Sequence, residues 1–290
     1  MRKRQKKTKA NGPMILMGAA LIGVLGIASA GMFYTTKAVS ALQAEVTELR
    51  VEVSEAAQNQ TAPEDFQYAV ARSLETLAQK KLKEQIDAKY EEYAAAAEPV
   101  PGGKSIYGNV NARFTLVEFS DLECPFCKRF HDTPKQIVDA SKGNVNWQWK
   151  HLPLSFHNPA ANQQALAAEC VREQQGNQGF WVFLAEVFKH TRGNGQGVPA
   201  LVEIIEGVGA DVSEVRECMA EGRYNDKIEA DTQQAVSHGI NGTPATFVID
   251  NTTGKTQLLT GAQPAQAIMA AIRKMMAEQE AQAAAGATGE

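Results

Sequence analysis

Residues 121–131, DLECPFCKRFH, hold two cysteines at C-x-x-C spacing directly after an apolar run. Two thiols at this spacing can exchange electrons, bind a metal or form a structural cross-link. A cysteine at the start of a helix lies at the positive end of the backbone dipoles, which favours the thiolate over the thiol. We therefore expect Cys124 to be an ionised nucleophile and Cys127, one turn further along, to be a more buried resolving thiol.

The proton of Cys127 needs an acceptor whenever this thiol attacks. Glu118 lies six residues before Cys124 on the incoming apolar segment. A carboxylate beneath the pair could relay the proton. Glu118 is thus the third candidate catalytic residue.

Metal binding is an alternative, because His131 could share a helix face with Cys124 and Cys127. A structural zinc site uses four ligands, usually from two such pairs. The sequence has no second C-x-x-C and no H-x-x-x-H near the first. We expect no resident metal here. A purely structural disulfide within C-P-F-C would close a loop too short to stabilise the chain much.

The N-terminus predicts a membrane anchor. Residues 1–12 are basic, and residues 13–34 form a run of 22 residues without a charge. Such a run spans about 33 Å as a helix, against a hydrocarbon core of about 30 Å. The basic flank should stay cytoplasmic, which places the rest in the periplasm or another extracytoplasmic space. The alternative is a signal peptide cleaved near Ala28-Ser29-Ala30.

Charge narrows the choice of partners. The chain has a net charge of −4, and without the six cations of residues 1–10 the remainder carries −10. An acidic body is a poor binder of polyanions, so nucleic acid is an unlikely partner class. Four cysteines in an exported chain are expected to be oxidised, catalytic or both.

Residues 35–98 predict a helical stalk. Apolar residues at alternating three- and four-residue steps, Val39, Leu42, Val46, Leu49 and Val53, form the seam of a coiled coil. A second helix is predicted from Pro63 to about Ala97. We expect the stalk to make the protein a homo-oligomer; a solvated amphipathic helix is the alternative. Prolines and glycines from Pro99 on mark the next boundary.

Residues 99–277 predict an α/β domain. Strands are expected at residues 114–119, 145–152, 245–250 and 256–260, with a helical insertion over about 159–237 and a last helix over about 264–277. The small and polar residues 278–290 are expected to be disordered.

Three segments together, DLECPFCKRFH, the preceding TLVEFS and the distant GINGTPATFVID, resemble the DsbA-like branch of the thioredoxin superfamily over roughly residues 100–277. The resemblance implies a thioredoxin-like fold in which Cys124 is the nucleophile, Cys127 resolves and Glu118 is the buried carboxylate. It also implies a cis Thr243–Pro244 bond that faces the cysteines. Substrate would then bind at Thr243 and Pro244, with Pro125 and Phe126 beside them.

The chain departs from the family pattern between the cysteines. The strongest oxidases of this family carry histidine where Phe126 stands, and phenylalanine cannot donate a hydrogen bond to the thiolate. We therefore expect a less oxidising couple. Thr243 before the proline resembles the isomerase relatives, as does the N-terminal extension. Oxidation, isomerisation and reduction all remain open.

Cys170 and Cys218 fall in the helical insertion, in contexts that resemble helical positions of other exported members of the family. We predict a structural disulfide between them. Two separately buried free thiols are the alternative.

The sequence thus predicts a membrane-tethered envelope thiol-disulfide oxidoreductase that needs no dissociable cofactor. Its partners would be cysteine-containing exported proteins and a membrane or soluble redox partner. Two hypotheses from other classes are a non-enzymatic stalked scaffold or holdase, and a copper- or zinc-handling protein that uses the same cysteines.

Overall fold

The computed structural model describes residues 51, 63–96 and 100–287 of the chain. The predicted anchor at residues 13–34 and the predicted seam at residues 39–53, Val51 excepted, lie outside these residues. None of the helices described is long and apolar enough to cross a membrane. The chain divides into two compact units, residues 1–77 and 78–290, and the catalytic candidates all belong to the second.

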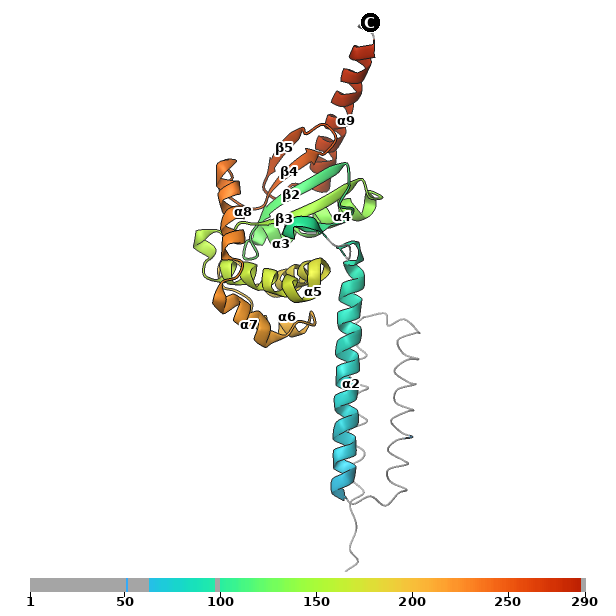
Figure 1. Ribbon diagram of the computed structural model, residues 1–290, viewed down its shortest axis with the longest axis vertical. Coiled ribbons are helices and arrows are strands. Elements are labelled where there is room, and N and C mark those ends of the chain that lie inside the picture. Colours follow the sequence, from blue (N-terminus) through green and yellow to red (C-terminus); the bar gives the residue numbers. More distant parts are fainter. Residues whose placement is uncertain (1–50, 52–62, 97–99, 288–290) are drawn as a thin grey trace, which may run out of the picture. The chain divides into compact units, whose positions relative to one another are not determined.

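A five-stranded sheet forms the centre of the second unit (Figure 1). Its order is β1-β3-β2-β4-β5. β2 and β3 run parallel, and the other neighbours are antiparallel. The strands are β1 (Ser105–Tyr107), β2 (Phe114–Ser120), β3 (Val145–His151), β4 (Ala245–Asp250) and β5 (Thr256–Thr260). β1 is the strand that sequence reasoning missed, because three residues at a sheet edge give no periodic signal.

The two faces of β2 belong to different cores. Leu116 packs in the larger cluster with Trp147 of β3 and residues of the helices, whereas Phe119 packs in a smaller cluster with Ala235 of the helical insertion. Alternate residues of a strand point to opposite faces. Glu118 therefore shares its face with Leu116 and lies within the larger core, where a charge is costly.

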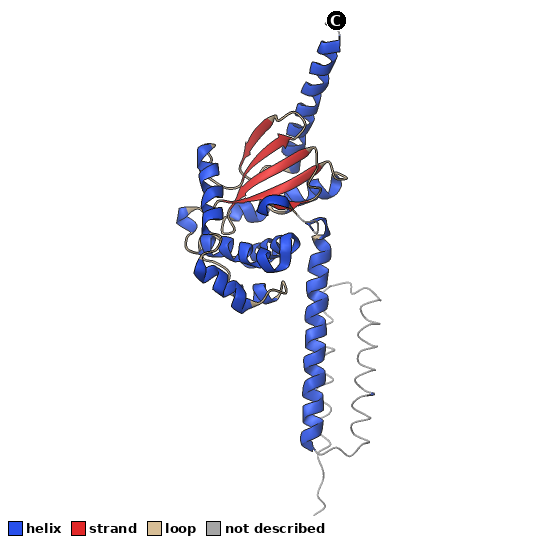
Figure 2. Ribbon diagram, viewed as in Figure 1, coloured by secondary structure: helices blue, strands red, loops and turns tan. Residues whose placement is uncertain are grey.

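Helices cover the sheet on both faces (Figure 2). The thioredoxin-like fold with a helical insertion, predicted from the sequence, is confirmed. The helices of the second unit are α3 (Pro125–Phe130), α4 (Asp132–Ala140), α5 (Ala160–His190), α6 (Leu201–Glu206), α7 (Val212–Glu221), α8 (Asn225–Ser237) and α9 (Ala265–Ala287). α5 is interrupted at Gly176, whose φ of 69° is accessible to glycine at little cost.

The helical insertion carries a cross-link and a buried charge cluster. Cys170 of α5 and Cys218 of α7 form a disulfide with a Cα–Cα distance of 5.9 Å. Next to it the buried Glu169 carboxylate contacts His151 of β3, Arg172 and Lys227 of α8, at 3.1, 2.7 and 2.7 Å. These contacts hold the pKa of Glu169 at about 2 although burial opposes them. The insertion is thereby tied to the end of β3.

The last part of α2 (Pro63–Glu92) packs on the catalytic unit. Lys89 donates to the Gly207 carbonyl at 2.8 Å, and the Tyr90 hydroxyl donates to the Val208 carbonyl at 2.9 Å. Tyr93, just past the helix end, is 3% exposed within the main core. The segment predicted as stalk thus supplies core residues to the domain that follows it.

The C-terminal end differs from the expectation of disorder after residue 277. α9 continues to Ala287, through most of the segment predicted to be disordered. Alanine, glutamine and glutamate dominate this segment, and all three have high helix propensity. Small and polar composition alone was therefore a misleading signal.

Candidate active site

The turn between β2 and α3 places Cys124 at the N-cap of α3, followed by Pro125 at its first position. Proline suits this position because its missing N–H would have no helical partner. The Asp121 carboxylate accepts hydrogen bonds from the backbone N–H groups of Glu123 and Leu154, at 2.7 and 2.8 Å. The Asp121 side chain thus holds the turn in shape and ties it to the segment after β3.

Cys124 faces Thr243. Its Sγ lies 3.4 Å from the Thr243 carbonyl oxygen, and the Thr243–Pro244 bond is cis. A hydrogen bond from the Cys127 thiol lowers the pKa of Cys124 to about 6, although burial opposes it; the Thr243 side chain and the backbone N–H groups of Cys127 and Phe126 lower it further. The buried Thr243 hydroxyl has no other partner, so it is free to donate to the thiolate. Cys124 is therefore largely ionised at neutral pH.

The pKa of Cys127 is shifted in the opposite direction. It is 0% exposed, and this burial, together with its hydrogen bond to Cys124 and the charges of Cys124 and Glu118, raises its pKa well above the ordinary value. One thiol of the pair is thus an anion and the other keeps its proton. The proton of Cys127 stabilises the neighbouring thiolate.

Glu118 is 0% exposed in the core beneath the pair. Burial raises the pKa of its carboxyl to about 8; the side chains of Ser120 and Trp147 partly offset this, and the charge of Cys124 adds to it. Ser120 and Trp147 approach the carboxyl without reaching full hydrogen-bond geometry, so neither oxygen is satisfied among the residues described. A carboxyl group that titrates near neutrality can accept and return a proton during turnover.

Glu123, the residue before the nucleophile, is also 0% exposed. Its carboxylate accepts hydrogen bonds from the Gln164 amide at 2.7 Å, the Thr191 hydroxyl at 2.5 Å and the Gly197 N–H at 2.9 Å. Its backbone carbonyl accepts from the Asn194 N–H at 2.7 Å. Residues 191–197, hereafter the α5 loop, are thereby fastened to the turn that carries Cys124.

Two exposed aromatic rings flank this turn. Phe126, between the cysteines, is 54% exposed, and Phe156, in the segment after β3, is 73% exposed. The neighbour of Phe156, His157, contacts the Asp121 carboxylate at 2.8 Å. Exposed aromatic side chains near a reactive thiol suit the binding of unfolded polypeptide.

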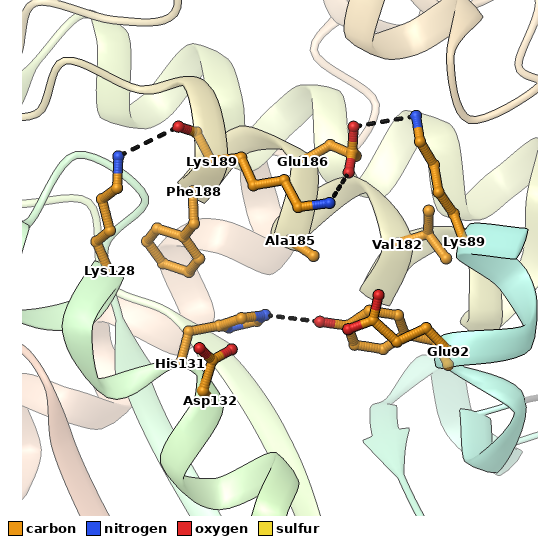
Figure 3. A pocket seen from close by; sticks show the side chains of 11 residues that line it. Lys89, Glu92, Lys128, His131, Asp132, Val182, Ala185, Glu186, Phe188 and Lys189 are labelled. Carbon is orange, nitrogen blue, oxygen red and sulfur yellow. Dashed lines mark hydrogen bonds and ion pairs between the residues drawn. The ribbon is translucent and has the colours of Figure 1, made fainter. Parts of the chain in front are cut away.

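A pocket of about 310 Å³ lies between the end of α2, the C-terminal part of α3 and α5. Figure 3 shows the ion pairs of Glu186 with Lys89 and Lys189 along one wall of this pocket, with His131 opposite them. The His131 Nε2 lies 3.4 Å from the Tyr93 hydroxyl, and burial lowers the pKa of His131 to about 3. His131 is therefore neutral and engaged within the core.

A zinc-type site here would need further ligands beside Cys124 and Cys127. In the part of the chain that the structure describes, no three side chains of histidine, cysteine, aspartate or glutamate gather around one point. Cys124 and Cys127 interact with each other, and His131 turns toward Tyr93.

The structure brings Cys124, Cys127, Pro125, Phe126, Thr243 and Pro244 together, with Glu118 beneath the thiols. Cys170 and Cys218 lie apart from them, in the insertion. Sequence reasoning missed Asp121, Glu123 and Phe156. The two carboxylates flank the C-x-x-C motif, which was a usable signal, whereas their partners Leu154, His157, Thr191 and Gly197 are distant in sequence and could not be inferred.

A reactive and a protected thiol at a helix start, facing Thr243 and Pro244 above a buried carboxyl, define the class of DsbA-type thiol-disulfide oxidoreductases. Residues 101–274 match the family described as Thioredoxin. The structure of DsbA2 from Pseudomonas aeruginosa is 34% identical, with a TM-score of 0.55, over 61% of this chain and 97% of that one. The chain belongs to the thioredoxin family.

Two curated relatives each match about half of the chain. Disulfide bond formation protein D of Bacillus subtilis (strain 168) is 25% identical over 166 residues, which are 54% of this chain and 72% of the relative. The Na(+)/H(+) antiporter NhaA 3 of Salinispora tropica is 30% identical over 149 residues. That match covers 51% of this chain and only 22% of the antiporter.

Proposed function

We propose that this protein exchanges disulfides with cysteine-containing exported polypeptides through Cys124 and Cys127. The observation that carries the proposal is the geometry of the two thiols: Cys124 stands at the N-cap of α3, 3.4 Å from the Thr243 carbonyl oxygen, and Cys127 is buried behind it. This arrangement lowers the pKa of the first thiol and raises that of the second. In such a pair the ionised thiol can form a mixed disulfide with a client, and the protonated thiol can then attack that mixed disulfide and release the client. The match to DsbA2 of Pseudomonas aeruginosa supports this reading.

In the oxidising direction, a client thiolate attacks Sγ of Cys124 in the Cys124–Cys127 disulfide. The bond between the two sulfurs breaks, and Cys127 leaves as a thiolate that takes a proton from Glu118. A second client thiolate then attacks the client sulfur of the mixed disulfide and releases Cys124 as the stabilised thiolate. The client is oxidised by two electrons and the pair is reduced by two. A redox partner of the membrane or the periplasm would restore the disulfide.

The direction of exchange depends on the potential of the couple. A stabilised Cys124 thiolate favours the reduced pair and so makes the disulfide more oxidising, and 30 mV corresponds to about 1.4 kcal/mol. Phe126 offers no side-chain donor to the sulfur. We propose a couple less oxidising than that of the histidine-containing oxidases, compatible with isomerisation.

Client segments would bind in extended form across Thr243 and Pro244, with Pro125, Phe126 and Phe156 beside them. The basic residues 1–12 and the uncharged residues 13–34 support an inner-membrane anchor with the catalytic domain in the periplasm. Tyr68, Leu74 and Leu82 are exposed on α2 and support self-association of the segment 35–98. Oligomerisation would place several thiol pairs near one client.

Trapping the intermediate tests the proposal. Cys127→Ser should accumulate a mixed disulfide between Cys124 and a reduced secreted protein with several cysteines, visible as a shifted band without reductant. Cys124→Ser should form none and should lose oxidation and isomerisation of that client. A Cys124→Ser protein with full activity would show that the chain acts as a scaffold and not through its thiols.

A further inference from the structure

The α5 loop lies beside the nucleophile. A Cβ added to Gly193 would meet the Glu123 carbonyl oxygen at 3.3 Å and the Pro125 ring at 3.5 Å, so this backbone approaches the turn closely. Thr191 and Asn194 are hydrogen-bonded to Glu123. Arg192 stands between these fixed points with an exposed side chain. The backbone of Arg192 is therefore held next to Gly193, the residue that approaches Pro125, while the Arg192 side chain is exposed.

A second cation lies on α3 itself. Arg129 is exposed, and its guanidinium carbon lies 4.7 Å from the centre of the Phe126 ring. Residues three apart share a helix face, so Arg129 and Phe126 form one surface beside Cys124. Among the residues described, the side chains of Arg129 and Arg192 have no hydrogen bond or ion pair, and both positive charges are available to a partner.

The carboxylates nearby face elsewhere or are occupied. Asp121 contacts His157, and Glu123 accepts its three hydrogen bonds inside the protein. Glu186 pairs with Lys89 and Lys189. Asp132 is exposed but lines the pocket on the His131 side of α3 (Figure 3). The exposed cations around Cys124 without an ion pair among the residues described are thus Arg129, Arg192 and Lys128, and the Lys128 ammonium is held by the Lys189 and Thr191 carbonyls, at 3.4 and 3.1 Å. They lie on a chain whose net charge is −4.

We infer that Arg129 and Arg192 select partners with a negative charge next to the sulfur that reacts with Cys124. The inference rests on the proposed function and adds a specificity to it: segments with aspartate or glutamate beside the reacting cysteine exchange faster than those with lysine or arginine. Opposite charges speed the encounter and are screened by salt. Arg129 and Arg192 are in this sense specificity residues, distinct from the groups that perform the exchange.

Three small disulfides of different charge test this directly. The reduced protein is mixed with anionic dithiobis(nitrobenzoate), cationic cystamine or neutral hydroxyethyl disulfide. In each case the Cys124 thiolate attacks one sulfur and releases the other half as a thiolate; Cys127 then displaces the second half. The rate with the neutral reagent is measured for every variant. The other two rates are divided by it, which corrects for any change in the fraction of Cys124 present as thiolate. The readout is the ratio of the anionic to the cationic rate.

The variants are Arg129→Gln, Arg192→Gln and their combination, with Arg216→Gln as the matched control. Arg216 is an exposed arginine on α7 in the insertion, likewise without an ion pair among the residues described. At low salt we expect the ratio to fall about threefold in each single variant and about tenfold in the double variant. It should stay at the native value in Arg216→Gln, and 1 M salt should erase the differences.

A double variant with the native ratio at low salt would overturn the inference and leave the proposed function intact. A reduced protein that reacts with none of the three reagents would overturn the proposed function, and the inference with it. The same comparison with two client peptides, Asp-Cys-Asp or Lys-Cys-Lys at the reacting site, extends the test to polypeptide. Equal rates for the two peptides at low salt would also contradict the inference.

Discussion

Cys124 owes its low pKa first to a neighbouring side chain. The position at a helix start was evident from the sequence, and the backbone N–H groups of Phe126 and Cys127 do contribute. The largest contribution is the hydrogen bond from the Cys127 thiol, which the helix-terminus argument left out. It depends on Cys127 keeping its proton, and that follows from burial in the folded core.

The pKa of Cys124 should therefore rise when Cys127 loses its thiol. We expect Cys127→Ala to titrate clearly above the native value of about 6, because the main donor to the thiolate is gone. Cys127→Ser keeps a hydroxyl donor and should lie between the two. The ultraviolet absorbance of the thiolate against pH measures all three proteins. An alanine variant that titrates with the native midpoint would contradict this assignment.

Glu118 should make the folded protein less stable as the pH rises. Its pKa is raised from 4.5 to about 8, so between these values the folded state holds a proton that the unfolded state has lost. The free energy of unfolding from this group then falls through that range and is constant above it. Relative to the native protein, Glu118→Gln should gain up to about 5 kcal/mol between pH 4.5 and 8.

Urea unfolding of both reduced proteins at several pH values measures this difference. The comparison of the two proteins is needed because the lowered pKa of Cys124 acts in the opposite sense, stabilising the fold as the pH rises from about 6 to 9. A difference between the proteins that does not change with pH would show that Glu118 is ionised in the fold.

At the scale of elements, the site depends on contacts between segments far apart in the chain. Strands β2, β3, β4 and β5 and the start of α3 could be predicted from apolar runs and the proline after Cys124. The α5 loop could not, since its place is set by Glu123 through Thr191 and Gly197, some seventy residues away. Local pattern reports which face of an element is buried, but not which loop covers a given carboxylate.

The disulfide between α5 and α7 should stabilise the insertion without taking part in exchange. Cys170 and Cys218 are 48 residues apart, and closing such a loop is worth about 4 kcal/mol in the chain-entropy account. Replacing both with alanine should lower the free energy of unfolding by up to about that amount. The rate of Cys124 with hydroxyethyl disulfide should stay native at temperatures where the variant is folded. Loss of that reactivity in a folded variant would place the bridge within the mechanism.

At the scale of the whole molecule, the catalytic unit begins inside the segment predicted as stalk. Proline and glycine content placed the boundary at residue 99, yet Tyr93 and Ala96 are buried in the core of the catalytic unit. Helical periodicity does not tell whether an apolar face meets a second helix, another subunit or the chain's own next domain. Truncations should therefore be cut before residue 78.

Two truncations separate catalysis from self-association. Residues 78–290 should keep native reactivity of Cys124, and, if the stalk assembles subunits, should lose recovery of a scrambled multi-disulfide client. Residues 99–290 lack Tyr93 and should be less stable by about 3–5 kcal/mol, the cost of removing a large buried side chain. Refolding yield and urea unfolding measure the two effects. Full recovery of the client by residues 78–290 would show that assembly is not needed for isomerisation.

The Cys170–Cys218 bridge has a consequence for how the protein comes into being. A newly synthesised chain has both of these thiols reduced. It would therefore be a substrate for the disulfide exchange that we propose for the folded protein. Finished copies could then oxidise unfinished ones, and each bridge made in this way would leave one Cys124–Cys127 pair reduced, to be reoxidised by the redox partner before it acts again.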